Sequence, residues 1–291
     1  MNWQIENMEN TCVAYGCFDS MHKGHMAVAE KVKETAQEKG LTPVIISCPK
    51  PGRVLQTEEE KIYLFQKAGI ETVLIFPYEG GGDCTETEFV QKILADKLGA
   101  KALVIGEGHA HLGEIQTAAA AAGIDVVLCE TQEKDGHPIT DEMVKEVFDA
   151  CKFDEFIELC GHPYIMIGEV EHGKALGRTV GMPTANLSSV EDKIKPLDGV
   201  YATVVHVDNE LYKSMTNIGK RPSVDSFDYV TIEAFILDFS RDIYGKTLVL
   251  EVHQFVRGVQ KFANLEEVQK QVQKDIQKVR EVLENAVNEN N

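Results

Sequence analysis

The sequence lacks the features that mark several classes of protein. No apolar run approaches the length of a membrane span, and the first residues, MNWQIENMENTCVAYG, have no basic start followed by an apolar stretch. We therefore expect no signal peptide and a cytoplasmic location. The seven cysteines are an odd number without a CxxC pair, which predicts reduced, mostly buried thiols rather than a disulfide framework or a zinc site.

Basic residues are also scarce. The chain has 29 Lys and Arg against 47 Asp and Glu, a net charge of −18. Nucleic acids and anionic membranes are bound by an excess of Lys and Arg, so we expect neither as a partner. With 43% hydrophobic residues over 291 positions, the chain can form two domains with proper cores. A phosphate site in such a chain must concentrate its basic residues locally or use a metal ion, and the oligomeric state stays open.

The first half alternates short apolar runs with helical patterns, which predicts a mostly parallel sheet covered by helices. We expect strands over Cys12–Tyr15, Val44–Ile46, Val73–Phe76, Ala102–Ile105 and Val126–Leu128, and helices over Met26–Lys39, from Thr57 onward, over Glu86–Leu98 and over Lys145–Leu159. Gly161-His162-Pro163 then breaks the chain. We therefore expect one domain over residues 1–160 and a second over 161–291.

The second half changes to short strands without intervening helices, the pattern of an antiparallel barrel or sandwich. The expected strands are Tyr164–Glu171, Val200–Val207, Leu211–Asn217, Tyr229–Phe239 and Thr247–Phe255. Asn264, with Glu267 three residues later, predicts the start of a long last helix. Its apolar stripe consists of Val268, Val272, Ile276, Val279 and Leu283.

A first candidate site lies at the expected carboxyl end of the first strand. There His22-Lys23-Gly24-His25 leads into a helix. Ligands of such sheets bind at the carboxyl ends of strands, and a helix start with two histidines can hold phosphates. The alternative is a helix N-terminus with two incidental histidines.

A second candidate site is the glycine-rich stretch GEVEHGKALGRTVGMPTAN, which spans residues 168–186. Thr184 and Asn186 follow Pro183 and, two apart in an extended segment, project to the same side. A hydroxyl and an amide oxygen suit a hard divalent cation that shares phosphate oxygens. The spacing matches neither standard nucleotide fingerprint, so a plain glycine-rich hairpin is the alternative.

Glu233 is the third residue of interest. Strand alternation places this carboxylate on one face with Phe235, Leu237 and Phe239. A carboxylate on an apolar face is paired, at an edge or functional, and burial makes it a better base for a hydroxyl proton. The alternative is a solvated glutamate at the end of the barrel.

Several of these motifs resemble known families. GCFDSMHKGH is similar to the signature of the nucleotidyltransferase superfamily. A second set of motifs resembles riboflavin kinase: GKALGRTVGMPTAN, Asp198-Gly199-Val200-Tyr201, Asn217-Ile218-Gly219-Lys220-Arg221-Pro222 and Asp242-Ile243-Tyr244-Gly245. Their order is that of the bacterial bifunctional riboflavin kinase/FAD synthetases. The resemblance implies a Rossmann-like nucleotidyltransferase domain followed by a small antiparallel β-barrel with a C-terminal helix, an α/β protein as a whole.

The resemblance also implies roles in phosphoryl transfer from ATP to riboflavin. Glu233 matches the catalytic base, and Thr184 with Asn186 would hold Mg²⁺. The ATP phosphates would be wrapped by the loop that contains Gly173, Gly177, Arg178 and Gly181, although Arg178 is as well suited to anchoring the loop through a backbone carbonyl.

The flavin side departs from the family. Arg257 matches a flavin contact, whereas Val259 replaces a glutamate of the family, which leaves a riboflavin analogue open as the substrate.

The resemblance is incomplete in the first half. A glycine-rich segment of the family is replaced by the stretch from Glu107 to Gly113. In a hydroxyl-rich signature that contacts the ATP phosphates, two hydroxyls are replaced by Asp141 and Glu142, and an arginine by Met143. Carboxylates there repel a triphosphate, and Lys145 compensates only in part. We therefore expect the adenylyltransferase motif, His22, Gly24 and His25, to be kept but FMN adenylylation to be weak or lost.

His109 and His111 raise the question of a metal cluster with His22 and His25. We expect them instead to be satisfied or solvent-facing, because no carboxylate spacing completes a site. The leading hypothesis is thus a riboflavin kinase that uses ATP, riboflavin and Mg²⁺. The alternatives are a fully bifunctional FMN/FAD synthase and a non-catalytic flavin- or nucleotide-binding regulator.

Overall fold

The computed structural model describes residues 6–77, 85–172, 182–221, 229–284 and 286. The chain forms two compact units, Met1–Asp141 and Glu142–Asn291. Each is described by itself below.

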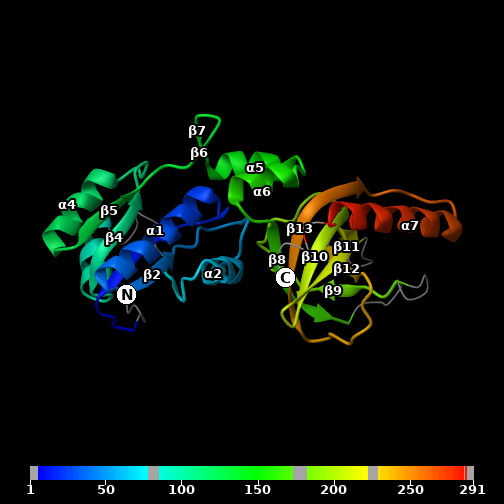
Figure 1. Cartoon of the computed structure of the whole chain (residues 1–291), viewed down its shortest axis with the longest axis horizontal. Coiled ribbons are helices and arrows are strands. Elements are labelled where there is room, and N and C mark those ends of the chain that lie inside the picture. Colours follow the sequence, from blue (N-terminus) through cyan, green and yellow to red (C-terminus); the bar gives the residue numbers. More distant parts are fainter. Residues whose placement is uncertain (1–5, 78–84, 173–181, 222–228, 285, 287–291) are drawn as a thin grey trace. The chain divides into compact units, whose positions relative to one another are not determined.

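The first unit is built on a parallel sheet of five strands in the order β3-β2-β1-β4-β5. The strands are β1 (Thr11–Gly16), β2 (Thr42–Ser47), β3 (Thr72–Ile75), β4 (Ala100–Gly106) and β5 (Asp125–Cys129). The helices are α1 (Lys23–Lys39), α2 (Glu58–Lys67), α3 (Glu86–Phe89), which continues as the π-helical segment η1 (Val90–Ala95), and α4 (Leu112–Ala122). Of these, α1 and α4 lie against the sheet (Figure 1). A short hairpin, β6 (Glu133–Lys134) and β7 (His137–Pro138), follows.

The strand order places the carboxyl end of β1 at a functional position. The chain runs outward from β1 to β2 and β3 and then returns to β4 on the other side of β1. Such a reversal opens a crevice at the carboxyl ends of the two central strands. Cys12, Val13 and Ala14 of β1 are fully buried, so the strand is a rigid base for the residues that follow it.

The second unit is a closed barrel in which β10-β11-β12-β9-β8-β13 follow one another, all pairs being antiparallel. Its strands are β8 (Tyr164–Glu171), β9 (Ala185–Leu187), β10 (Gly199–Val207), β11 (Glu210–Arg221), β12 (Tyr229–Ile236) and β13 (Thr247–Gly258). Its helices are α5 (Asp141–Asp149), α6 (Phe153–Cys160) and α7 (Leu265–Val282).

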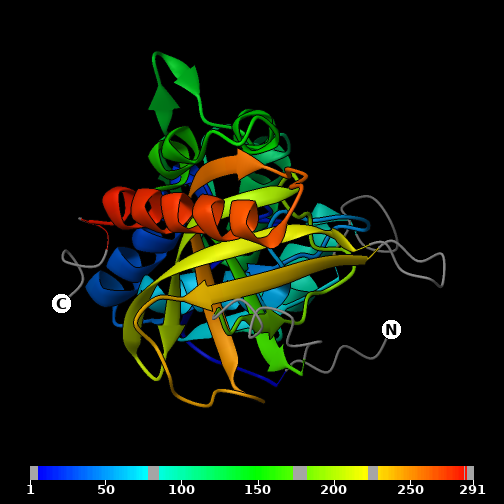
Figure 2. The same cartoon turned by 90° about the vertical axis from the view of Figure 1, so that its right-hand side faces the viewer.

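Helix α7 lies across the outside of the barrel (Figure 2). Asn264 caps it, and its Oδ1 accepts a hydrogen bond from the backbone N–H of Glu267 at 2.9 Å, as predicted. Its apolar residues pack on the outer barrel face with Val200, Met215 and Phe235; they are Val272, Ile276, Val279 and Leu283. The helix therefore forms one wall of any cavity on that face.

The predicted strands and most predicted helices are confirmed, although β12 ends at Ile236 rather than at Phe239, the β6–β7 hairpin was not predicted, and the helix predicted from Glu86 is π-helical from Val90. Other differences are the following. The helix expected over Lys145–Leu159 is two helices, because Cys151 between them takes a left-handed conformation with φ 55°. Helix α4 was missed because no side chain caps its start at His111 and its alanines carry no clear period. Strand β9 was missed because it has only three residues.

Helices α5 and α6 belong by their contacts to the second unit. The rings of Phe148 and Phe156 pack on Tyr164, and Phe153 packs edge-on against Tyr201. This aromatic cluster explains why α5 and α6 fall within the compact unit that contains the barrel, Glu142–Asn291.

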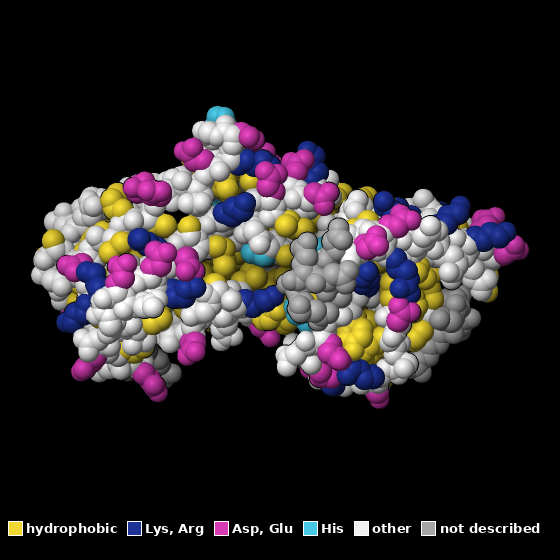
Figure 3. Space-filling view, viewed as in Figure 1, with side chains coloured by type: hydrophobic (Ala, Val, Ile, Leu, Met, Phe, Trp, Pro, Cys, Tyr) yellow, Lys and Arg dark blue, Asp and Glu magenta, His cyan; other side chains and the backbone are white. Residues whose placement is uncertain are grey.

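The described part of the chain contains no helix long and apolar enough to cross a membrane. On the face drawn in Figure 3, acidic and basic side chains are intermixed rather than gathered into a basic patch.

Candidate active sites

The turn between β1 and α1 is held rigidly. Phe18 and Met21 both have a φ of 52°, a conformation that costs energy in residues with side chains. Asp19 offsets this cost, because it is 4% exposed, lies 2.7 Å from the Lys50 ammonium and accepts a hydrogen bond from the Leu55 N–H at 2.9 Å. The rigid turn therefore fixes the position of His22, which follows it.

His22 is the N-cap of α1. Its Nδ1 accepts hydrogen bonds from the backbone N–H groups of Gly24 and His25, at 3.0 and 3.4 Å. The ring therefore folds over the helix start, where a Cβ on Gly24 would lie only 2.7 Å from its Cε1. The glycine between the two histidines is thus a steric requirement of the cap.

His25 completes a pair with His22. The two rings stack with centroids 3.8 Å apart and planes inclined by 16°. Burial, reinforced by the neighbouring His22, lowers the pKa of His25 to about 3, so this imidazole is neutral near pH 7. Its Nδ1 is buried without a hydrogen-bond partner.

Asp141 joins the histidine pair, which the sequence did not predict. Its Oδ1 accepts hydrogen bonds from the Ser20 hydroxyl at 2.5 Å and from the Ser20 N–H at 3.2 Å. One ligand-type atom from each of His22, His25 and Asp141 lies within 4.8 Å of the others. Burial works to raise the pKa of Asp141, but His25, Ser20 and His22 together hold it below its ordinary value. The carboxylate expected to disturb the site is thus built into it.

His109 and His111 lie apart from this group. His109 accepts a hydrogen bond from the His111 N–H at 3.2 Å and contacts the ring of Tyr15. Among the described residues, the cluster of possible metal ligands at this site contains neither of them. Lys145, expected to compensate the new carboxylates in part, is paired with Asp149 on its own helix at 2.6 Å.

In the barrel, three polar residues stand side by side on one face. Glu233 of β12 is paired in register with Asn186 of β9 on one side and with Asn217 of β11 on the other. Residues paired in this way point to the same face of a sheet. The half-buried Glu233 therefore stands between two side-chain amides.

Glu233 and Thr184 line a cavity of about 240 Å³, together with Asn217, Phe235, Arg257 and Asp275. This cavity lies on the barrel face that α7 covers, because Val272 of that helix also lines it.

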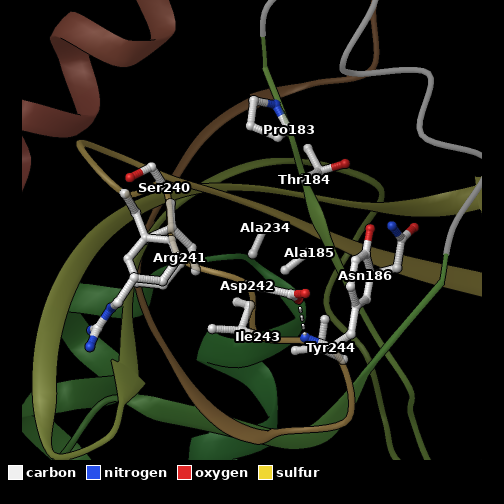
Figure 4. A pocket seen from close by; sticks show the side chains of 13 residues that line it. Pro183, Thr184, Ala185, Asn186, Ala234, Ser240, Arg241, Asp242, Ile243 and Tyr244 are labelled. Atoms are coloured by element: carbon white, nitrogen blue, oxygen red, sulfur yellow. Dashed lines mark hydrogen bonds between the residues drawn. The ribbon is translucent and has the colours of Figure 1, made fainter.

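A second cavity of about 290 Å³ adjoins the first through Thr184, which lines both. Figure 4 shows it between the segment Pro183–Asn186 and the segment from Ser240 to Tyr244. Asp242 is fixed there by a hydrogen bond of 3.1 Å from the Tyr244 N–H to its Oδ1. Thr184 thus stands where two substrates in adjoining cavities could meet.

Arg257, expected to contact a flavin, is engaged within the protein. Its Nη2 lies 2.8 Å and its Nε 2.9 Å from Oδ2 of the buried Asp275, and its Nη1 donates to the Gly258 carbonyl. Gln271 donates to the other oxygen of Asp275 at 2.8 Å. The arginine therefore ties β13 to α7 while forming part of the cavity wall. Val259, at the position of the missing family glutamate, is 68% exposed.

The structure brings together Thr184, Asn186, Glu233 and Arg257 from three segments of the chain, which are Pro183–Asn186, β12 and β13. Four of the expected phosphate-binding residues, Gly173, Gly177, Arg178 and Gly181, lie outside the described residues.

Comparison with known proteins agrees with this division of sites. The FAD synthetase family model matches residues 4–142, and the riboflavin kinase family model matches residues 160–283. A bifunctional riboflavin kinase/FMN adenylyltransferase from Pseudomonas fluorescens is 32% identical over 283 residues, which is 91% of each chain. A protein of the same description from Listeria monocytogenes is 30% identical over 93% of this chain and 92% of its own.

A crystal structure described as a macrolide-efflux protein from Streptococcus pneumoniae matches with a TM-score of 0.78, covering 95% of this chain and 96% of that one. At 24% identity this match shows a likeness of fold alone. The identities and coverage of the two relatives, with one family model on each half, show that the chain belongs to the bifunctional riboflavin kinase/FMN adenylyltransferase family.

Proposed function

We propose that this chain carries out two consecutive reactions, the phosphorylation of riboflavin to FMN and the adenylylation of FMN to FAD. The observation that carries the proposal is that one chain matches both family models over separate halves. The riboflavin kinase match begins at residue 160, which supports a border between the two catalytic modules at residues 160/161. We expect the enzyme to act on small molecules in the cytoplasm.

In the kinase reaction, the oxygen of the riboflavin 5′-hydroxyl attacks the γ-phosphorus of ATP. ADP leaves, and the hydroxyl proton passes to a base. Glu233 is suited to accept it, because its carboxylate lines the smaller cavity with Thr184 at the border to the larger one. Flavin in the smaller cavity and ATP in the larger one would meet at Thr184. Most of the remaining catalysis comes from positioning the two substrates and from neutralising charge on the phosphates.

The residues around Thr184 fit a magnesium ion. Asn186 lies in register between Glu233 and Glu171, so hydroxyl, amide and carboxylate oxygens are grouped at this edge of the cavity. A hard cation prefers such oxygen ligands. We assign Thr184 and Asn186 as its ligands; when bound, the ion would neutralise charge on the ATP phosphates. Gly173, Gly177, Arg178 and Gly181 would contact the same phosphates.

Arg257 would contribute to flavin binding as a wall of the smaller cavity. Its donors to Asp275 and Gly258 are already in use, so its role is to hold α7 against β13 and to present a flat guanidinium to the ligand. A wall of this kind would accept riboflavin, and the replacement of the family's glutamate by Val259 leaves a riboflavin analogue open as the substrate.

In the second reaction, a phosphate oxygen of FMN attacks the α-phosphorus of ATP, and pyrophosphate leaves. His22, Gly24 and His25 form the phosphate-facing motif at the start of α1. The residues Asp141, Glu142 and Met143 predict that this reaction is weak or lost. The family membership over the whole chain favours an active site instead, and Asp141 is held by Ser20 beside the histidines rather than left as an unpaired carboxylate.

A chromatographic product assay with riboflavin, ATP and Mg²⁺, run long enough for a second step, tests the proposal. FMN followed by FAD is the expected result. FMN alone would mean that the substitutions at Asp141 and Glu142 have removed adenylylation. Flavin that binds without any consumption of ATP would instead indicate the regulator.

A further inference from the structure

The group formed by His22, His25 and Asp141 has the composition of a metal site. Two imidazoles and one carboxylate offer ligand atoms within 4.8 Å of one another. The three residues come from two distant segments of one compact unit, since Asp141 is hydrogen-bonded to Ser20, 121 residues earlier in the turn after β1. His22 is 8% exposed, whereas His25 and Asp141 are half-buried and retain access to solvent.

Two further observations suggest that a ligand is expected there. The buried Nδ1 of His25 has no hydrogen-bond partner, although buried polar atoms are nearly always satisfied. Asp141, in turn, is fixed by two hydrogen bonds from Ser20 to one of its oxygens. Ser20 thus orients the carboxylate in the way that outer hydrogen bonds orient metal ligands.

We propose that His22, His25 and Asp141 bind a divalent transition-metal ion, and that this ion holds the ATP phosphates during FMN adenylylation. The metal site is inferred from this chain's own residues, while its role rests on the proposed adenylylation.

The ligand types restrict the metal. Imidazole nitrogens suit Zn²⁺, Mn²⁺, Fe²⁺ and Co²⁺, whereas Mg²⁺ favours a set of oxygen ligands. Three protein ligands leave one or more positions for phosphate oxygens, as in catalytic zinc sites. His22 would bind through Nε2, because its Nδ1 accepts from the helix N-terminus. The stacked rings would have to turn apart, and the terminal torsion of histidine permits this at low cost.

The ion would also resolve an electrostatic conflict. A carboxylate and a triphosphate repel each other at close range, and Lys145 is paired with Asp149 rather than directed at the site. A divalent cation between Asp141 and the phosphates would attract both the carboxylate and the phosphates, and so would offset the repulsion between them. The same carboxylate that weakens a metal-free site therefore strengthens a metal-loaded one.

The test begins with binding of Zn²⁺ alone to the full chain after removal of metals by a chelator. We expect calorimetry to reveal a site that Asp141→Asn weakens by about 10-fold or more, as loss of a first ligand should exceed the usual effect of an outer partner. Glu142→Gln is the matched control, because Glu142 is the exposed neighbouring carboxylate and does not belong to the cluster. Cobalt absorption then reports whether imidazoles ligate the ion.

The outcomes separate the site from the reaction. Absence of a Zn²⁺ site, or equal binding by wild type and Asp141→Asn, overturns the metal site whatever the product assay shows. If the site binds but no metal supports FAD formation, the proposed adenylylation fails while the site stands. If FAD forms equally fast with Mg²⁺ alone and with added Zn²⁺, Mn²⁺ or Co²⁺, or if these ions inhibit it, the role in phosphate binding is wrong.

Discussion

The ion pair between Arg257 and Asp275 should be one of the strongest single contacts between α7 and the barrel. Asp275 is 3% exposed, and its two oxygens receive Arg257 and Gln271. Removing one partner of a buried pair costs about 3–5 kcal/mol, because the other charge stays buried without compensation. The Arg257 side chain is 18% exposed at the cavity, so it can regain some water. We therefore expect Asp275→Asn to cost about 3 kcal/mol, the lower end of that range.

Hydrogen exchange of the α7 amides in the full-length chain, followed by mass spectrometry, measures this cost locally. A loss of about 3 kcal/mol corresponds to exchange that is roughly two orders of magnitude faster. Arg280→Gln on the same helix is the matched control. Its partner Asp238 lies at 2.8 Å, but the two side chains are 48% and 73% exposed, so the expected cost is about 0–1 kcal/mol.

The result that would refute this reasoning is an Asp275→Asn helix that exchanges no faster than the Arg280→Gln helix. Arg257 would then not be anchoring α7.

Three further predictions concern the two reactions. Glu233→Gln should lower the turnover of FMN formation by roughly 10²–10⁴-fold, the usual contribution of a general base; near-normal turnover would remove it from that role. Thr184→Ala should raise the Mg²⁺ concentration needed for half-maximal kinase activity, since it removes an oxygen ligand, and an unchanged titration would count against the assignment. His22→Ala should abolish FAD formation while FMN formation continues; loss of both reactions would mean that the two sites are not independent.

Much of the fold follows from local patterns in the sequence. Apolar runs such as Val44–Ile46 predict strands because a parallel sheet buries both faces, and the capping box at Thr57 predicts the start of α2, whose two reciprocal hydrogen bonds are both present. Local patterns do not predict a short strand that is stabilised only by pairing with strands distant in the sequence. Strand β9 has three residues and exists because β8 and β12 pair with it on either side.

The candidate sites also contain one feature that local spacing predicts and one that depends on a contact between distant segments. The spacing of Thr184 and Asn186 predicts a common side for the two residues. Both line the larger cavity, but so does Ala185 between them, so their common side stays a prediction. The approach of Asp141 to Ser20, 121 residues away, has no local signal, because it depends on how the chain returns after β5. The resemblance showed only that a hydroxyl had been lost at Asp141. It gave no sign that the replacing carboxylate would be oriented and hydrogen-bonded beside two histidines.

The two candidate sites share one electrostatic feature, which is that few of their described basic side chains are left without a carboxylate partner. Of the described residues that line the two barrel cavities, the basic ones are Arg241 and Arg257. Arg241 lies 2.7 Å from Glu210, and Arg257 lies 2.8 Å from Asp275, so each guanidinium already has a carboxylate as its partner. The histidine site has an ionised Asp141 and a neutral His25. In a chain with a net charge of −18, the described basic residues of the two barrel cavities are therefore already paired. Besides Arg178, phosphate binding should then draw on backbone N–H groups and divalent cations, so metal binding is the property that most directly tests the two assignments.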